Sequence, residues 1–67
     1  MDLKEFGLRV AKERTRMDIS AYELSLRISK DAGYIWKVEN GKVNISVKTM
    51  LEICGALGIS PEELFKS

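Results

Sequence analysis

The sequence predicts a small all-α domain, and three observations support this prediction. Apolar residues recur at spacings of three and four, as they do along one face of a helix. Serines suited to the N-cap of a helix precede three of these patterns, at Ser20, Ser46 and Ser60. Glycines follow where two of the patterns end, at Gly41 and Gly58. We therefore expect five short helices in a single domain that spans residues 1–67.

The first helix is predicted over residues 2–17. Its apolar stripe has a period close to 3.6 and consists of Leu3, Phe6, Val10 and Met17. Arg14 falls on the same stripe. A guanidinium that faces the core is costly unless a carboxylate and hydrogen bonds meet it. The alternative is that Arg14 reaches the edge of the helix and stays in water, and periodicity alone does not decide between the two.

Residues 20–42 have the outline of a helix-turn-helix, which is two short helices joined by a tight turn. Ser20 and Glu23 have capping-box spacing at the start of the first of these helices. We expect the second to run from Asp31, as its N-cap, to Asn40. At 100° per residue its core side holds Ile35 and Val38. The opposite side holds Gly33, Lys37 and Asn40, with Trp36 beside them.

Two further helices complete the predicted domain. One follows Ser46 and carries a stripe of Met50, Ile53, Cys54 and Leu57. The last is short, starts from the Ser60-Pro61 cap and carries Leu64 and Phe65.

Composition excludes several kinds of site. The single cysteine allows no internal disulfide, and its apolar surroundings predict a buried structural thiol. Without histidine there is no ligand set for zinc and no cysteine–histidine dyad. Scattered acids and the absence of a glycine-rich loop lead us to expect no enzyme, metal or cofactor. No stretch approaches the roughly 18 apolar residues of a membrane span, and the N-terminus lacks a signal-peptide core, so we expect a cytoplasmic protein.

Charge is unevenly distributed along the chain, although the net charge is only +1. Residues 1–48 hold ten basic and seven acidic residues, whereas residues 49–67 hold one and three. A polyanion-binding face would place basic charge with the helix-turn-helix in this way. An exposed helix with Lys37 and Asn40, preceded by Lys30, suits the major groove of DNA. The residues alone also allow a helical interaction domain whose charged faces are only solvated.

The stretch from Ile19 to Lys42, with VENGK at 38–42, resembles the Cro/CI-type (XRE) helix-turn-helix family. The likeness extends through MLEICGALGISPEELF at 50–65 and through the first helix from Phe6 to Arg14. It implies a compact five-helix, lambda-repressor-like domain whose second and third helices read double-stranded DNA. The implied function is a sequence-specific transcriptional regulator, expected to be a repressor, with the third helix in the major groove.

The resemblance also implies roles for particular residues. It pairs Arg14 with Glu39 in a partly buried structural clamp. The base-reading positions fall on Ala32, Gly33, Tyr34 and Lys37. The family's phosphate contacts fall on Ser20, Ala21, Asn40, Lys42 and Asn44, and we add Lys30 as a phosphate contact because it precedes the exposed helix. A homodimer is implied, formed in solution or only on DNA, with half-sites about 34 Å apart or a multiple of that.

The sequence departs from the family pattern at positions that contact DNA. Ala21 stands where glutamine is common, so one side-chain phosphate bond is expected to be missing. Ala32 and Gly33 offer no hydrogen-bond donors from their side chains. Ser29 and Lys30 replace the usual glycine and small apolar residue of the turn. These departures predict modest sequence discrimination unless the protein is dimeric or reads DNA shape.

A second hypothesis is a protein-interaction module, such as an antitoxin or the partner of another regulator. Its candidate contacts are Trp36, Leu64 and Phe65, together with Tyr34 and Leu26. Trp36 has two further interpretations, an aromatic edge over the gap between the third and fourth helices and a contact with the DNA backbone.

Overall fold

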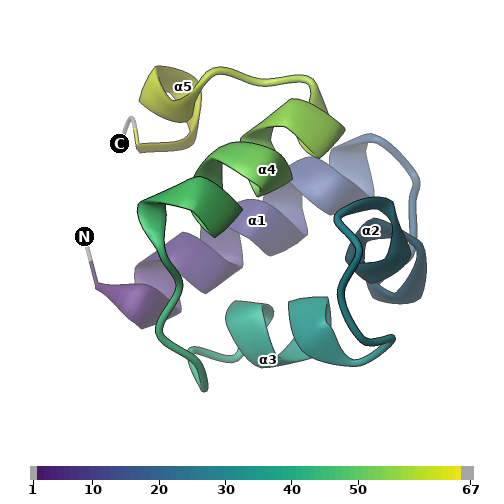
Figure 1. Cartoon of the computed structure of the whole chain (residues 1–67). Helices are drawn as coiled ribbons and strands as arrows, with labels where there is room; N and C mark the ends of the chain where they lie inside the picture. Colours follow the sequence, from purple (N-terminus) through teal and green to yellow (C-terminus); the bar gives the residue numbers. More distant parts are fainter. Residues whose placement is uncertain (1, 66–67) are drawn as a thin grey trace.

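The computed structural model describes residues 2–65, and within this part of the chain every regular element is a helix (Figure 1). The five helices are α1 (Leu3–Arg16), α2 (Ala21–Arg27), α3 (Tyr34–Glu39), α4 (Val47–Leu57) and α5 (Pro61–Phe65). The predicted all-α fold is therefore confirmed. Over residues 2–65, no helix is long and apolar enough to cross a membrane.

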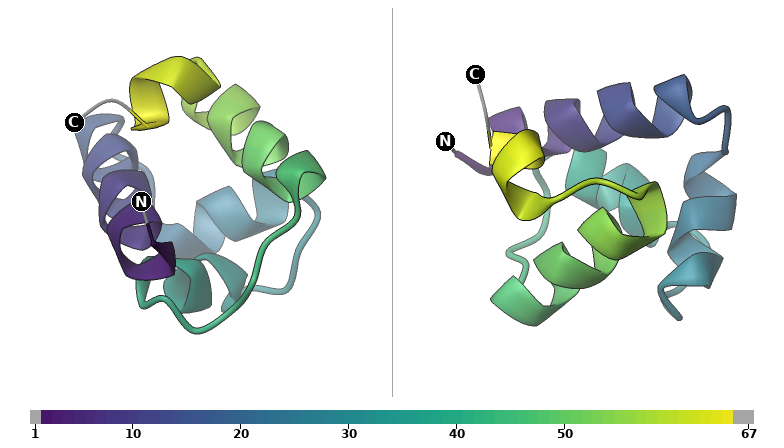
Figure 2. Two further views of the ribbon diagram at one scale, coloured as in Figure 1. Left: turned by 90° about the vertical axis from the view of Figure 1, so that its left-hand side faces the viewer. Right: turned by 90° about the horizontal axis from the view of Figure 1, so that it is seen from above.

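The helices enclose one hydrophobic core. In Figure 1, α3 and α5 lie at opposite ends of the molecule, and the first view in Figure 2 shows the helices arranged as a ring. Each helix contributes at least one buried apolar side chain, and these are Phe6, Val10, Leu24, Ile28, Ile35, Val38, Ile53, Cys54, Leu57 and Leu64, with Ile28 at the C-cap of α2. Cys54 is buried as predicted, and burial raises the pKa of its thiol.

The helix starts follow from local sequence, because side-chain oxygens accept the first free amide groups. Ser20 Oγ accepts from the Glu23 amide at 2.9 Å, and Ser46 and Ser60 cap α4 and α5 in the same way. The three predicted serine caps are confirmed. Gly41 has a φ of +66°, the left-handed conformation expected where the third helix ends.

The predicted start of α3 is wrong. Asp31 does not cap a helix, because residues 31–33 form a turn and α3 begins at Tyr34 with Gly33 as its N-cap. A helix that began after Asp31 would direct the Ile35 amide to the Asp31 carbonyl. Instead the Ile35 amide donates to Ser25 Oγ of α2 at 3.0 Å.

The predicted partner contact at Leu64 is also wrong. Leu64 is 1% exposed and belongs to the core, so it cannot meet another molecule. The adjacent Phe65 is 41% exposed, and its ring stacks on Phe6 of α1 with a centroid separation of 5.9 Å. The end of α5 therefore packs beside the start of α1 with one side chain inward and one at the surface.

Candidate nucleic-acid interface

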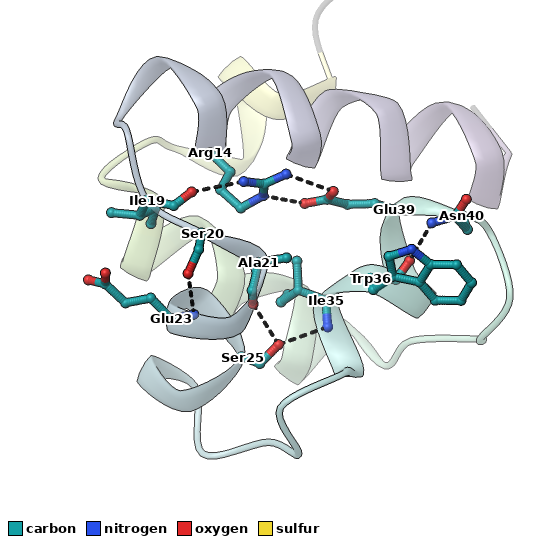
Figure 3. A network of polar contacts seen from close by, with 10 residues as sticks. All are labelled: Arg14, Ile19, Ser20, Ala21, Glu23, Ser25, Ile35, Trp36, Glu39 and Asn40. Atoms are coloured by element: carbon teal, nitrogen blue, oxygen red, sulfur yellow. Dashed lines mark hydrogen bonds and ion pairs between the residues drawn. The ribbon is translucent and has the colours of Figure 1, made fainter.

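Ser25 joins the two helices of the helix-turn-helix. Its hydroxyl is fully buried, donates to the Ala21 carbonyl at 2.8 Å and accepts from the Ile35 amide at 3.0 Å (Figure 3). Gly33 has no side chain with which to cap α3, so a residue of α2 satisfies an amide of its first turn. Our sequence reasoning missed Ser25. The available signal was a serine next to Leu24 on the buried side of α2.

Arg14 and Glu39 lie together where α1 passes the end of α3. Arg14 Nε donates to Glu39 Oε2 at 2.7 Å, and Nη2 donates to Oε1 at 3.1 Å. Nη1 donates to the Ile19 carbonyl at 2.8 Å, so the guanidinium also holds the chain between α1 and α2 (Figure 3). The side chains are 20% and 11% exposed. The hydrogen bonds that Arg14 donates to Glu39 raise the pKa of Arg14, despite the opposing effect of burial.

Gly7 allows α1 to approach the end of α3 closely. A Cβ atom at this position would lie 2.4 Å from the Val38 carbonyl oxygen and 2.7 Å from that of Glu39. These are backbone atoms and cannot rotate away. The close approach brings the backbone of Glu39 against the helix that carries Arg14. Sequence reasoning missed this role as well, since a glycine inside a helical pattern has no local signal that names its partner.

The outward side of α3 carries a stripe that the fold leaves free. Gly33, Trp36, Lys37 and Asn40 have the spacing of one helical face, and all are exposed. Ile35 and Val38, on the opposite side, are 0% and 2% exposed. Ala32 is exposed in the turn before the helix.

Two expected DNA contacts of this region also contact each other. The Lys30 ammonium lies over the Tyr34 ring, 5.2 Å from its centroid. Tyr34 is half-buried against the core, and burial raises the pKa of its hydroxyl. Only part of the Tyr34 side chain therefore faces solvent, and the Lys30 side chain covers one face of its ring.

The remaining expected phosphate contacts lie around this surface. Ser20, Lys42 and Asn44 are exposed, whereas Ala21 is half-buried beside the core. Within residues 2–65, Lys37 and Lys42 take part in none of the ion pairs, which are Arg14–Glu39, Arg16–Glu13 and Arg27–Glu23. Their charge is thus available to an anionic ligand.

Two packed helices with a fixed crossing and a free, partly basic outer side define a helix-turn-helix domain. Residues 10–64 match the Helix-turn-helix family model. The chain therefore belongs to this family of DNA-binding transcription regulators, which are not enzymes, and the XRE-type resemblance is confirmed.

Two individual relatives are similar over about nine-tenths of their length, and a third shares the fold. The chain is 36% identical over 66 residues to the control protein C.MunI of a Mycoplasma species, covering 96% of this chain and 89% of that protein. It is 38% identical to the restriction-modification controller protein C.AhdI of Aeromonas hydrophila, covering 96% and 93%, with a TM-score of 0.89. The clp gene regulator ClgR of Corynebacterium glutamicum, 23% identical over 91% of this chain and 79% of that one, shares the fold with a TM-score of 0.85.

Proposed function

We propose that this protein is a homodimeric controller of a restriction–modification system and acts by binding DNA upstream of the genes that it regulates. The observation that carries the proposal is the similarity to C.MunI and C.AhdI. Both are named as control or controller proteins, and the match leaves little of either chain uncovered. The free outer side of α3 supports the same activity.

In the proposed complex α3 lies in the major groove. Lys37 is long enough to reach guanine O6 and N7, and Ala32 can contact a thymine methyl. The proposed base-reading set is Ala32, Gly33, Tyr34 and Lys37. Phosphate contacts by Ser20, Ala21, Lys30, Asn40, Lys42 and Asn44 would fix the register of the protein on the duplex.

The Arg14–Glu39 pair has an indirect role in this proposal. It holds the end of α3, and with it Asn40 and Lys42, at a fixed position relative to α1. Two copies related by a two-fold axis would present their α3 helices to half-sites about 34 Å apart or a multiple of that.

Selection from random duplexes followed by salt titration tests the DNA-binding part. We expect a recurring symmetric site, and affinity that falls steeply as salt rises. Lys37→Ala should relax the site preference, whereas Lys42→Ala should weaken all duplexes alike and lower the salt slope by about 1. Lys12→Ala, an exposed change on α1, is the matched control and should do neither. Salt-independent binding, or no recurring site, would support a protein-interaction module instead.

The identity of the regulated genes has its own test. Restriction endonuclease and methyltransferase genes beside this gene, with the selected site upstream of them, would support the controller assignment. A selected site found only upstream of unrelated genes would overturn that assignment and leave DNA binding intact.

A further inference from the structure

We infer that Trp36 is a base-reading residue, whose indole packs on thymine methyl groups in the major groove. This inference rests on the proposed placement of α3. The indole is 53% exposed, and Figure 3 shows it outside the ribbon of α3, beside Asn40. Its backbone carbonyl accepts from Asn40 Nδ2 at 2.8 Å, so the backbone of this turn is held while the ring stays free.

The position of Trp36 favours DNA over an aromatic cover for the core. The core contacts of α3 are made by the neighbouring apolar residues Ile35 and Val38, which are buried. Gly33, three residues earlier on the same face, has nothing within 4 Å of the place where a Cβ would be. The indole therefore stands beside open surface on the side of α3 that points away from the core.

The surroundings of Trp36 favour DNA over a protein partner. Apolar protein interfaces need a contiguous apolar patch, but the exposed side chains of α3 are Trp36 and Lys37 alone. Lys37, which is exposed and has no ion-pair partner within residues 2–65, adds a cation to the same outward side of α3. A flat apolar surface beside free positive charge matches a thymine methyl bordered by phosphates.

The structure also explains why an aromatic contact is needed at this position. Ala32 and Gly33 have no donors, and Tyr34 is half-buried with Lys30 over its ring. The indole is the largest apolar surface left on the outward face of α3. It compensates for the missing hydrogen-bond readout with van der Waals contact to the one base substituent in the groove that is apolar.

Trp36 is the only tryptophan in the chain, so its emission reports on this residue alone. The first experiment measures acrylamide quenching of the wild-type protein with and without a fluorescently labelled duplex taken from the selection. We expect quenching to fall when the duplex binds, with no fall for a labelled duplex that does not bind. Unchanged quenching while the duplex is bound would overturn this inference but not the proposed function. Trp36 would then be a candidate contact for a protein partner. Failure of any duplex to bind would overturn the proposed function, and with it this inference.

A second experiment identifies the contacted base. Duplexes selected by Trp36→Ala should lack a thymine preference that duplexes selected by the wild-type protein show. Duplexes selected by Leu8→Ala, an exposed apolar change on α1, should keep that preference. Replacing that thymine by uracil removes one methyl and should weaken wild-type binding about fourfold. The same replacement should leave Trp36→Ala unaffected. Protection from acrylamide without any effect of uracil would place the indole on the DNA backbone and refute base reading.

Discussion

Replacing Gly7 with alanine tests whether the contact between α1 and α3 sets the position of the recognition helix. The added Cβ would lie 2.4 Å from the Val38 carbonyl oxygen, whereas ordinary contact begins near 3.4 Å. The two helices must therefore separate by about 1 Å, the difference of these distances. Such a shift also moves the backbone of Glu39 away from α1 and strains its bonds to Arg14.

The expected cost follows from two opposing effects. Overpacking of this severity costs about 3 kcal/mol. Removing the conformational freedom of a helical glycine returns about 1 kcal/mol. The net destabilisation is about 2 kcal/mol, which in a domain of this size lowers the melting temperature by about 8–16 °C.

Gly55→Ala is the matched control, because Gly55 lies inside α4 with nothing within 4 Å of its missing Cβ. The Gly55→Ala change should raise the free energy of unfolding by about 1 kcal/mol. Thermal melts followed by circular dichroism, together with duplex affinity, compare the two variants. If Gly7→Ala melted at or above the wild-type temperature, close helix approach would not be what holds α3.

Three further changes test the contacts that position α3. Glu39→Gln keeps an acceptor for Arg14 but removes the charge, and chemical denaturation should show a loss of about 3 kcal/mol in the free energy of unfolding; melting within a degree or two of wild type would refute the clamp. Ser25→Ala leaves the Ile35 amide without its acceptor and should cost about 1–3 kcal/mol. Hydrogen exchange at that amide should accelerate, and an unchanged rate would contradict the role assigned to the hydroxyl. Ser29→Gly relieves a φ of +59° and should stabilise the protein by about 1 kcal/mol in the same denaturation assay, while an unchanged midpoint would show that the turn is unstrained.

Features of the fold that depend on neighbouring residues could be predicted from the sequence. Ser20, Ser46 and Ser60 cap helices because the bond from a serine to an amide three residues later needs no other part of the chain. Gly41 follows the end of α3 for a similarly local reason, because glycine adopts the left-handed conformation without a steric cost.

Features that depend on tertiary contacts could not be predicted in this way. Asp31 has the chemistry of an N-cap, but the hydroxyl of Ser25 takes the amide that such a helix would use. In α5, a five-residue helix, periodicity cannot tell which of Leu64 and Phe65 faces the core. The pairing of Arg14 with Glu39 was predicted from the family resemblance. The periodicity of α1 alone did not decide whether Arg14 faces the core or stays in water at the edge of the helix.

The brevity of α3 limits what one domain can recognise. Six residues at 1.5 Å each give a helix about 9 Å long, which spans about three base pairs of 3.4 Å. Two copies would read about six base pairs, and with four alternatives at each, such a site recurs by chance about every 4,000 base pairs. A genome offers millions of competing positions. A dimer of this protein would therefore need information beyond two recognition helices to bind one site in a genome, from the deformability of the DNA between the half-sites or from several adjacent sites occupied together.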